Sequence, residues 1–321
     1  MSAFIRLLLF SATLLSVAPA HGQAGRFRWE RSTDSVVLSE NGQKVLAYQI
    51  TTKDKEGRWP RANYVHPLYS LSGGEITEDF PEDHGHHRGI FWAWHQVIVD
   101  EQPIGDAWLC QDFEWVVSNV EQTTALEAAK LTSTIHWQSP VLVDDAGKAV
   151  SIAREEVEIC AYATTENFRC IDFTISLLAL LPNVRIGGSD DAKGYGGFSP
   201  RVALNRDQIF QGENGELEPI KTAIDAGPWV NLSDSSNGIA ILCHPTNPVV
   251  GPKNGAKDNT QYQPWILRRS RSMQNAVYPG RDPVELSDAK PLVLKYRLVV
   301  HDGTLSRGRI AKIFEQYRSD S

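Results

Sequence analysis

Two stretches of alternating side chains limit what this chain can fold into more than any other feature. Between residues 150 and 162, and again between 168 and 181, apolar and polar side chains take turns along the chain. A repeat of two is the repeat of a β-strand, so one face of each stretch is expected to be buried. The turn-like segment Thr164–Asn167 between them predicts that the two strands form a long hairpin.

Shorter runs of the same kind predict further strands. They are residues 36–39, 44–50, 89–99, 113–120, 126–137, 229–232, 238–243 and 292–301. The first two flank Asn41-Gly42, and Asn-Gly between two such runs is a strong hairpin signal. Residues 182–275 are rich in Gly, Pro and Asn, which indicates long loops between strands.

One segment near the C-terminus predicts a helix. Ile310, Ile313, Phe314 and Tyr317 follow the i, i+3, i+4, i+7 spacing of a helix with one apolar stripe. Thr304 or Ser306 could cap its start. The sequence therefore predicts an all-β fold with a C-terminal helix, a single large antiparallel β-sandwich domain over residues 23–321.

The first 22 residues have the layout of a secretory signal peptide. Arg6 precedes the apolar run Leu7–Val17, and small residues follow up to Gly22. The alternative is a membrane anchor, but the run is much shorter than the roughly 20 residues that span a bilayer. We therefore expect an exported protein, periplasmic or extracellular, with no membrane span after the leader is removed.

The net charge of the 321-residue chain is −7. An acidic protein repels the phosphates of nucleic acids and the headgroups of anionic membranes, so neither is expected as a partner. The sequence does not address the oligomeric state.

The four cysteines form no CxxC pair, which argues against a thiolate zinc site or a thioredoxin-type redox motif. Cys160 and Cys170 flank the turn of the long hairpin, and in an oxidising compartment they could form a disulfide. The alternative is that both are buried free thiols.

Five of the nine histidines fall within thirty residues of one another. They are His66, His84, His86, His87 and His95. Imidazole exchanges protons near neutral pH, a neighbouring carboxylate such as Asp83 can fix its tautomer, and Arg88 could stabilise an oxyanion. Because Pro81, Gly85 and Gly89 break regular structure, this segment is expected to form a shaped loop that enters the strand beginning near Ile90.

We therefore predict an acid–base site in this loop. Its proposed catalytic residues are His66, Asp83, His84, His86, His87 and Arg88. The alternatives are surface histidines with no joint role and histidines that bond to a turn. A divalent metal at His84, His86 and His87 is a less favoured alternative, because their spacing matches neither HExxH nor a facial triad.

Residues elsewhere in the chain could complete the site. Trp92 and Trp94 share one strand face, where they either stack on a sugar ring or pack in the core. Tyr195 is a further acid–base candidate, and Arg201, His244 and His301 are candidate substrate-binding residues. Each of these lies in or near a Gly- or Pro-containing turn, so a purely structural role is the alternative.

Several motifs together carry a family resemblance, from about Arg61 to the C-terminus. They are Tyr64-Val65-His66-Pro67-Leu68-Tyr69, Asp79-Phe80-Pro81-x-Asp83-His84-x-His86-His87-Arg88-Gly89, Gly194-Tyr195-Gly196-Gly197, His244-Pro245-x-Asn247-Pro248 and Tyr296-Arg297-x-Val299-Val300-His301-Asp302-Gly303. The set resembles the PmoA-like family, secreted bacterial proteins that carry the label "methane oxygenase". The resemblance implies a fold similar to the galactose-mutarotase-like super-sandwich, and work on carbohydrates.

The leading hypothesis is an exported carbohydrate-active enzyme that acts on oligosaccharides, a lyase or dehydratase in preference to a hydrolase. His66, His86 or His87 would be the base, and Tyr195 or another histidine the acid. Arg88 or Arg201 would hold a carboxylate or a developing enolate. The alternatives are a non-catalytic sugar-binding protein that uses its tryptophans, and the metal-dependent oxygenase that the family label suggests.

Overall fold

The structure is a computed structural model that describes residues 25–203, 207–248, 250, 263–269 and 273–319. The predicted signal peptide, residues 1–22, lies outside these residues. Within the described part of the chain, no helix is long and apolar enough to cross a membrane.

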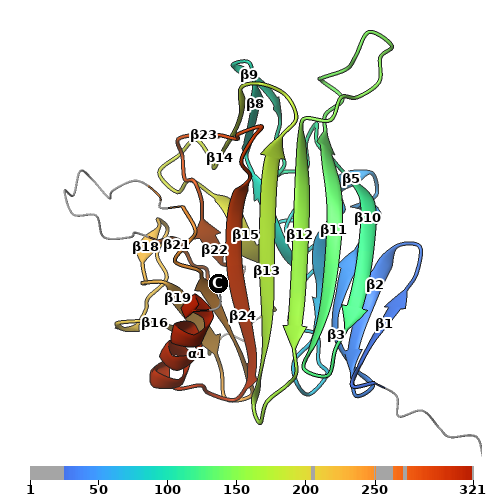
Figure 1. The fold of residues 1–321 in the computed structure, drawn as a ribbon. Helices are drawn as coiled ribbons and strands as arrows, with labels where there is room; N and C mark the ends of the chain where they lie inside the picture. Colours follow the sequence, from blue (N-terminus) through green and yellow to red (C-terminus); the bar gives the residue numbers. More distant parts are fainter. Residues whose placement is uncertain (1–24, 204–206, 249, 251–262, 270–272, 320–321) are drawn as a thin grey trace, which may run out of the picture.

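Two nine-stranded antiparallel sheets form the body of the molecule (Figure 1). The first sheet has the order β1 (Phe27–Arg31), β2 (Ser35–Glu40), β3 (Gln43–Gln49), β6 (Tyr64–Leu68), β7 (Ile90–Trp94), β15 (Gly196–Pro200), β22 (Asn275–Val277), β21 (Pro264–Ile266) and β18 (Ile224–Asp225). The second sheet has the order β10 (Glu114–Thr124), β11 (Ala128–Gln138), β12 (Ala153–Tyr162), β13 (Phe168–Ala179), β24 (Leu292–Asp302), β20 (Asn237–Cys243), β19 (Trp229–Ser233), β16 (Ile209–Gly212) and β17 (Gly215–Glu216).

Smaller elements complete the fold. A four-stranded sheet has the order β23 (Val284–Glu285), β14 (Val184–Gly187), β8 (Gln96–Val99) and β9 (Gln102–Gly105). A two-stranded sheet pairs β4 (Lys53–Lys55) with β5 (Arg58–Arg61), and helix α1 spans Arg307–Ser319.

The core lies between the two large sheets and is rich in aromatic side chains. Trp94 of the first sheet packs on Trp137 of the second, with ring centroids 5.6 Å apart. Phe198 stacks on Tyr296 across the same interface, at 4.4 Å. Large rings of this kind bury much apolar surface and hold the layers at a fixed separation. The predicted large antiparallel β-sandwich with a C-terminal helix is confirmed.

Helix α1 forms as predicted. Its four apolar residues Ile310, Ile313, Phe314 and Tyr317 are buried in a cluster with side chains of β19, β20 and β24. The hydroxyl of Ser306 accepts a hydrogen bond from the backbone N–H of Arg309 (3.3 Å) at the start of the helix. The helix therefore covers part of the second sheet's outer face (Figure 1).

Two predictions about strands need correction. The predicted strand 89–99 is broken at His95, where β7 ends and β8 leaves for the four-stranded sheet. Residues 182–275, predicted as mostly loops, also contain the short strands β14 to β18 and β21. These strands have too few residues to show a period in the sequence.

Cys160 and Cys170 do not form the disulfide that an oxidising compartment would allow. In the β12–β13 hairpin, Cys160 stands opposite Asp172, so the register separates the two cysteines. All four cysteines are buried thiols outside any disulfide, as expected if Cys160 and Cys170 do not pair.

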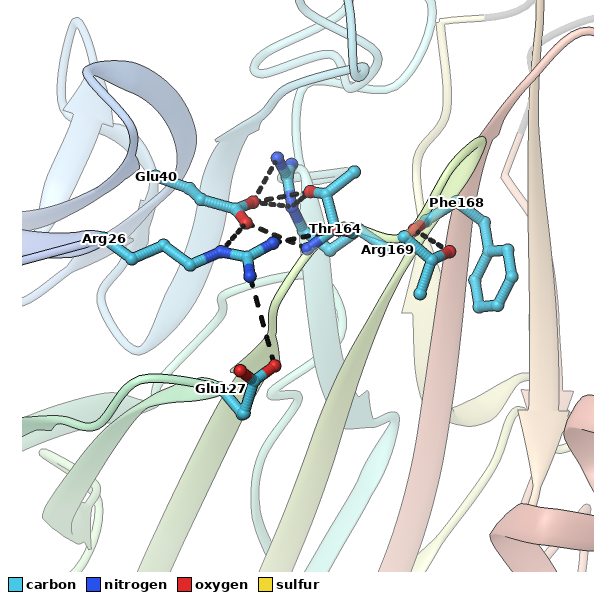
Figure 2. Close-up of polar contacts among 7 residues, drawn as sticks. Arg26, Glu40, Glu127, Thr164, Phe168 and Arg169 are labelled. Atoms are coloured by element: carbon cyan, nitrogen blue, oxygen red, sulfur yellow. Dashed lines mark hydrogen bonds and ion pairs between the residues drawn. The ribbon is translucent and has the colours of Figure 1, made fainter.

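A buried ion cluster ties the edge of the first sheet to the β12–β13 turn (Figure 2). Glu40, at the end of β2, accepts a bond from Arg26 Nε at 2.7 Å and one from Arg169 Nη2 at 3.0 Å. Thr164 donates both its backbone N–H and its hydroxyl to the same carboxylate. Burial alone would raise the pKa of Glu40, but these hydrogen bonds and the charge of Arg169 outweigh burial and lower the pKa.

Replacing Glu40 by Gln should destabilise the fold by about 3 kcal/mol at pH 7, because Arg169 would keep a buried charge without its partner. The folded-state pKa of Glu40 is depressed, so its contribution is complete above the carboxyl pKa of the unfolded chain. The contribution is lost as pH falls through the folded-state pKa. Urea unfolding of both proteins at neutral and acidic pH measures the difference, which should shrink in acid.

Glu127→Gln is the matched control from the same cluster. Its side chain is 73% exposed and lies 4.0 Å from Arg26, so its removal should cost less than about 0.5 kcal/mol. Equal effects of the two substitutions would contradict this account of the cluster.

Candidate functional site

The base of the histidine loop is held by a buried arginine. Arg88 Nε lies 2.5 Å from Asp79 Oδ1, and Arg88 Nη2 lies 2.5 Å from the hydroxyl of Tyr64. Its Nη1 donates to the backbone carbonyls of Lys53 (3.0 Å) and Trp59 (2.8 Å). With no exposed side-chain surface, Arg88 cannot contact a substrate, so its predicted catalytic role is wrong. It instead fixes the two ends of the loop.

Two glycines let this loop pack close to its neighbours. A Cβ at Gly85 would lie 2.1 Å from the indole ring of Trp59. Gly89 has a φ of +52°, and a Cβ there would lie 2.1 Å from the carbonyl oxygen of Val65. The glycines of the motif are therefore required for the loop's shape.

The loop brings three imidazoles together. The rings of His84 and His87 stack with centroids 4.8 Å apart and an interplanar angle of 5°. His86 meets His87 edge-on at 4.5 Å. Burial, followed by the charges of His84 and Arg61, lowers the pKa of His86 to about 4. Near neutral pH His86 is thus an uncharged imidazole.

These histidines line a cleft of about 990 Å³, a size typical of ligand sites. The lining residues are His84, His86, His87, His95, Trp108, Leu109, Lys193, Tyr195, Pro219, Ile220, Lys221, Leu267, Arg268, Arg269 and Met273. Phe91 of β7 contacts both His87 (6.1 Å between centroids) and Trp108 (5.2 Å), while Trp92 faces the second sheet. The cleft therefore lies on the outer side of the first sheet.

A network behind the loop sets the tautomer of His87. Arg201 Nη2 donates to Asp83 Oδ1 at 2.9 Å, and Arg201 Nη1 lies 3.2 Å from Nδ1 of His87. A guanidinium only donates, so Nδ1 of His87 accepts and Nε2 carries the proton. Burial, with the charges of His86 and Arg201, lowers the pKa of His87 far below its usual value. Asp83 also accepts from Nδ1 of His84 at 3.0 Å.

A second imidazole is held in the opposite tautomer. Nδ1 of His95 lies 2.9 Å from Asp106 Oδ2, and a carboxylate accepts, so in the neutral ring the proton is on Nδ1 and Nε2 is the unprotonated nitrogen. The other oxygen of Asp106 accepts the backbone N–H of Leu109 at 2.8 Å. The ring of His95 stacks on Trp108, with centroids 5.3 Å apart.

The sequence places His95 among the clustered histidines but indicates no role for it. Nothing in the sequence identifies Asp106 as its partner. The two become neighbours because β8 and β9 form a hairpin that returns the chain to the end of β7. An aspartate directly after a short strand was the only signal in the sequence, and it is too common to identify a partner.

Tyr195 and Arg268 line the same cleft and contact each other. The hydroxyl of Tyr195 lies 2.5 Å from Arg268 Nη2. The Tyr195 ring contacts Trp108, with centroids 5.5 Å apart, and Lys193 Nζ lies 5.3 Å from the centre of the Tyr195 ring. Trp108 thus touches both the tyrosine and the imidazoles, and Tyr195 joins the predicted loop histidines in one cleft.

The predicted substrate-binding tryptophans belong to the core. Trp92 Nε1 donates to the buried carboxyl of Glu155, and Trp94 Nε1 donates to the carbonyl of Tyr278 at 2.9 Å. They do share a strand face, but that face meets the second sheet, so stacking on a sugar is wrong for both.

Three further predicted residues do not line the cleft. His66 is half-buried with Nδ1 3.0 Å from the hydroxyl of Thr77, and burial lowers its pKa. His301 lies on β24 and bonds Asn231 through Nε2 at 3.0 Å. His244 follows β20 and lines a separate cavity of about 400 Å³. The predicted roles of His244 and His301 in a shared cleft are wrong, because His301 lies on the second sheet and His244 directly follows one of its strands.

Arg201 has a different role from the one predicted. Its side chain is 4% exposed, and it pairs with Glu78 at 2.7 Å as well as with Asp83. It therefore acts on the cleft through His87 as a positioning residue, and it is not a substrate contact.

The metal alternative finds no support in the ring geometry. A metal ion needs nitrogen lone pairs that meet at one point in the planes of their rings. The rings of His84 and His87 are parallel and stacked, so their lone pairs do not converge. Within the described ranges, no three His, Cys, Asp or Glu side chains are arranged to hold an ion.

The comparisons with known proteins give the family. The chain belongs to the family of unknown function DUF6807, whose model matches residues 35–315. No curated protein matches it. The resemblance to PmoA-like proteins stays a prediction.

Two of the solved structures that are similar to the chain show the extent of the likeness. One is a proposed mutarotase (YeaD) from Salmonella typhimurium, with a TM-score of 0.39 and 11% identity over 86% of this chain and 94% of that chain. The other is a mutant of the heparan sulfate lyase HepC from Pedobacter heparinus, with a TM-score of 0.34 and 7% identity. It is matched over 89% of this chain, which spans only 38% of the lyase chain. At these values neither activity transfers to this chain.

The shifted pKa of His86 can be measured directly. We expect its imidazole to titrate at about 4 in the folded protein, and near 6.5 in the urea-unfolded chain, followed by proton–nitrogen NMR. As pH falls, the unfolded chain takes up a proton at His86 before the folded protein does. The contribution of neutral His86 to the free energy of unfolding is therefore complete above pH 6.5. It declines as pH falls towards 4. A folded-state pKa of 6 or above would contradict the burial of this ring.

Proposed function

We propose that the chain is a carbohydrate-active enzyme that performs acid–base chemistry in the cleft at Trp108, as a lyase or dehydratase in preference to a hydrolase. The observation that carries the proposal is a pair of imidazoles with opposite tautomers. Asp106 selects the tautomer of neutral His95 that leaves Nε2 unprotonated, and Arg201 selects the tautomer of neutral His87 that has its proton on Nε2. Both rings contact Trp108.

In this proposal His95 is the base. Its Nε2 takes a proton, and the carboxylate of Asp106 stabilises the imidazolium that results. His87 stays neutral, since burial and the charge of Arg201 oppose a second proton on its ring. A neutral imidazole with its proton on Nε2 can donate a hydrogen bond to an oxygen that becomes negative during the reaction.

Tyr195 is the acid of the proposal. The guanidinium of Arg268, 2.5 Å from its hydroxyl, would stabilise the oxygen once the proton has left. In a β-elimination, His95 removes the proton from the carbon next to a carbonyl or carboxyl group. A C–O bond then breaks at the adjacent carbon, a double bond forms, and the leaving oxygen takes the proton of Tyr195. Atoms and electrons balance without an oxidant.

The carbohydrate part of the proposal is supported by the cleft and by the PmoA-like resemblance. The cleft volume of about 990 Å³ accommodates more than one sugar ring, and its walls carry many hydrogen-bond donors. The sugar-binding alternative relied on Trp92 and Trp94, which are buried between the sheets. The proposed export of the protein would place the cleft where polysaccharide fragments are present.

His95→Ala should lower turnover by about 10²–10⁴-fold, the usual contribution of a general base. Asp106→Asn should lower it by about 10–100-fold, because the imidazole loses its orienting carboxylate. His136→Ala, on β11 of the second sheet, is the control and should keep full activity. The assay incubates the protein with a panel of plant and algal oligosaccharides and follows products by mass spectrometry.

The product masses also distinguish the reactions. Lyase fragments add up to the mass of the substrate, a dehydratase product lacks one water, and hydrolysis adds one. Full activity of both His95→Ala and His87→Ala would contradict the acid–base proposal. Binding of an oligosaccharide with no product would favour the sugar-binding alternative.

A further inference from the structure

The cleft collects positive charge in a protein of net charge −7. Four of its lining residues are cationic, namely Lys193, Lys221, Arg268 and Arg269, and none of the described lining residues is an Asp or Glu. Lys193 pairs with Asp191 at 3.0 Å and Arg269 with Glu218 at 3.2 Å, at the rim. Neither Lys221 nor Arg268 makes a salt bridge to a carboxylate of the described residues, so their charges act on the cleft.

The position of Arg268 is set by oxygens that carry no charge. Its Nη1 donates to the carbonyl of Ile220 at 2.7 Å and to its own neighbour Leu267 at 2.9 Å. Its Nη2 donates to the carbonyl of Lys221 at 2.9 Å and contacts the hydroxyl of Tyr195. Such contacts fix the group without neutralising it, so its charge is oriented before any ligand arrives.

The arginines first considered for holding an acidic group are not free to do so. Arg88 is paired with Asp79, and Arg201 with Glu78 and Asp83. Each already has its carboxylate inside the protein. An anion in the cleft would meet Arg268 and Lys221 instead, which line the same cleft as the imidazoles.

We propose that the cleft takes an acidic carbohydrate, whose anionic group binds between Lys221 and Arg268 beside Tyr195. This inference rests on the proposed function and names its substrate class. The anionic group is a carboxylate or a sulfate ester, since both suit a guanidinium and an ammonium group. For a uronate, the same positive charge would stabilise the enolate that forms when His95 removes the neighbouring proton.

Isothermal titration calorimetry with matched oligosaccharides tests the inference. The probes are a galacturonate tetrasaccharide, its fully methyl-esterified neutral form, a sulfated galactan tetrasaccharide and the unsulfated one. His95→Ala in the full chain is titrated, so that turnover does not consume the probe. We expect an acidic form to bind at least about 10-fold more tightly than its neutral match. The advantage should shrink as salt is raised, because exposed charges are screened.

Substitutions locate the subsite. Lys221→Gln should weaken acidic binding by about 10-fold and leave neutral binding unchanged, and Arg268→Gln should weaken acidic binding by at least as much. Lys221→Gln keeps the backbone carbonyl that Arg268 uses, so this variant tests the charge even if Arg268→Gln disturbs the wall. Lys312→Gln, an exposed cation on α1, is the control and should change neither.

Tighter binding of the carboxylate series assigns a uronate, and tighter binding of the sulfated series assigns a sulfated sugar. Equal binding of acidic and neutral forms, no binding of either acidic form, or acidic binding that survives Lys221→Gln would overturn the inference. Turnover of neutral oligosaccharides alone would also overturn the inference of an acidic substrate, but it would agree with the proposed enzymatic function. Specific acidic binding with no product from the wild-type protein would support the subsite and contradict the enzyme.

Discussion

The buried guanidinium of Arg88 is the contact on which the site depends. It joins Asp79 at one end of the histidine loop to the strand that starts at Ile90, and its other donors reach the hydroxyl of Tyr64 and two backbone carbonyls. Breaking a buried ion pair of this kind costs about 3–5 kcal/mol. An irregular loop has few backbone bonds of its own, so this charge keeps the loop against the sheet and the imidazoles at the cleft.

Burial, together with nearby charges that include buried arginines, lowers the pKa of His86 and His87. Arg201 lies directly behind His87, and Arg61 contributes to the lowered pKa of both His86 and His87. The Arg61 guanidinium lies between the rings of Phe91 (4.8 Å) and Trp115 (4.4 Å), which hold a cation in place without a carboxylate. Near pH 7 the cleft therefore presents His86 and His87 as neutral imidazoles.

The sequence predicted the features that depend on local period, and it missed those that depend on how distant segments meet. Alternation predicted the long strands, and the apolar stripe of residues 310–317 predicted the helix, because both patterns extend over many residues. Alternation also showed that Trp92 and Trp94 share a face. It could not show that β7 is buried on both faces, with the second sheet inside and the histidine loop outside. The pairing of His95 with Asp106 arises from a hairpin of two four-residue strands, which is too short to predict.

The sequence also did not show which groups the arginines pair with. An arginine beside histidines suggested a substrate contact at Arg88 and Arg201, yet a buried arginine must first satisfy its own charge within the fold. Arg268 and Lys221 had no motif around them, and only the structure places their charges in the same cleft as the imidazoles.

The central claim is that one cleft, on the outer side of the first sheet, is where the protein works. The most direct test is proton–nitrogen NMR of the histidine side chains while an acidic oligosaccharide is titrated into the protein. The imidazole signals of His84, His86, His87 and His95 should shift together with one affinity, while those of His244 and His301 stay unchanged. Shifts confined to His244 or His301 would contradict the account.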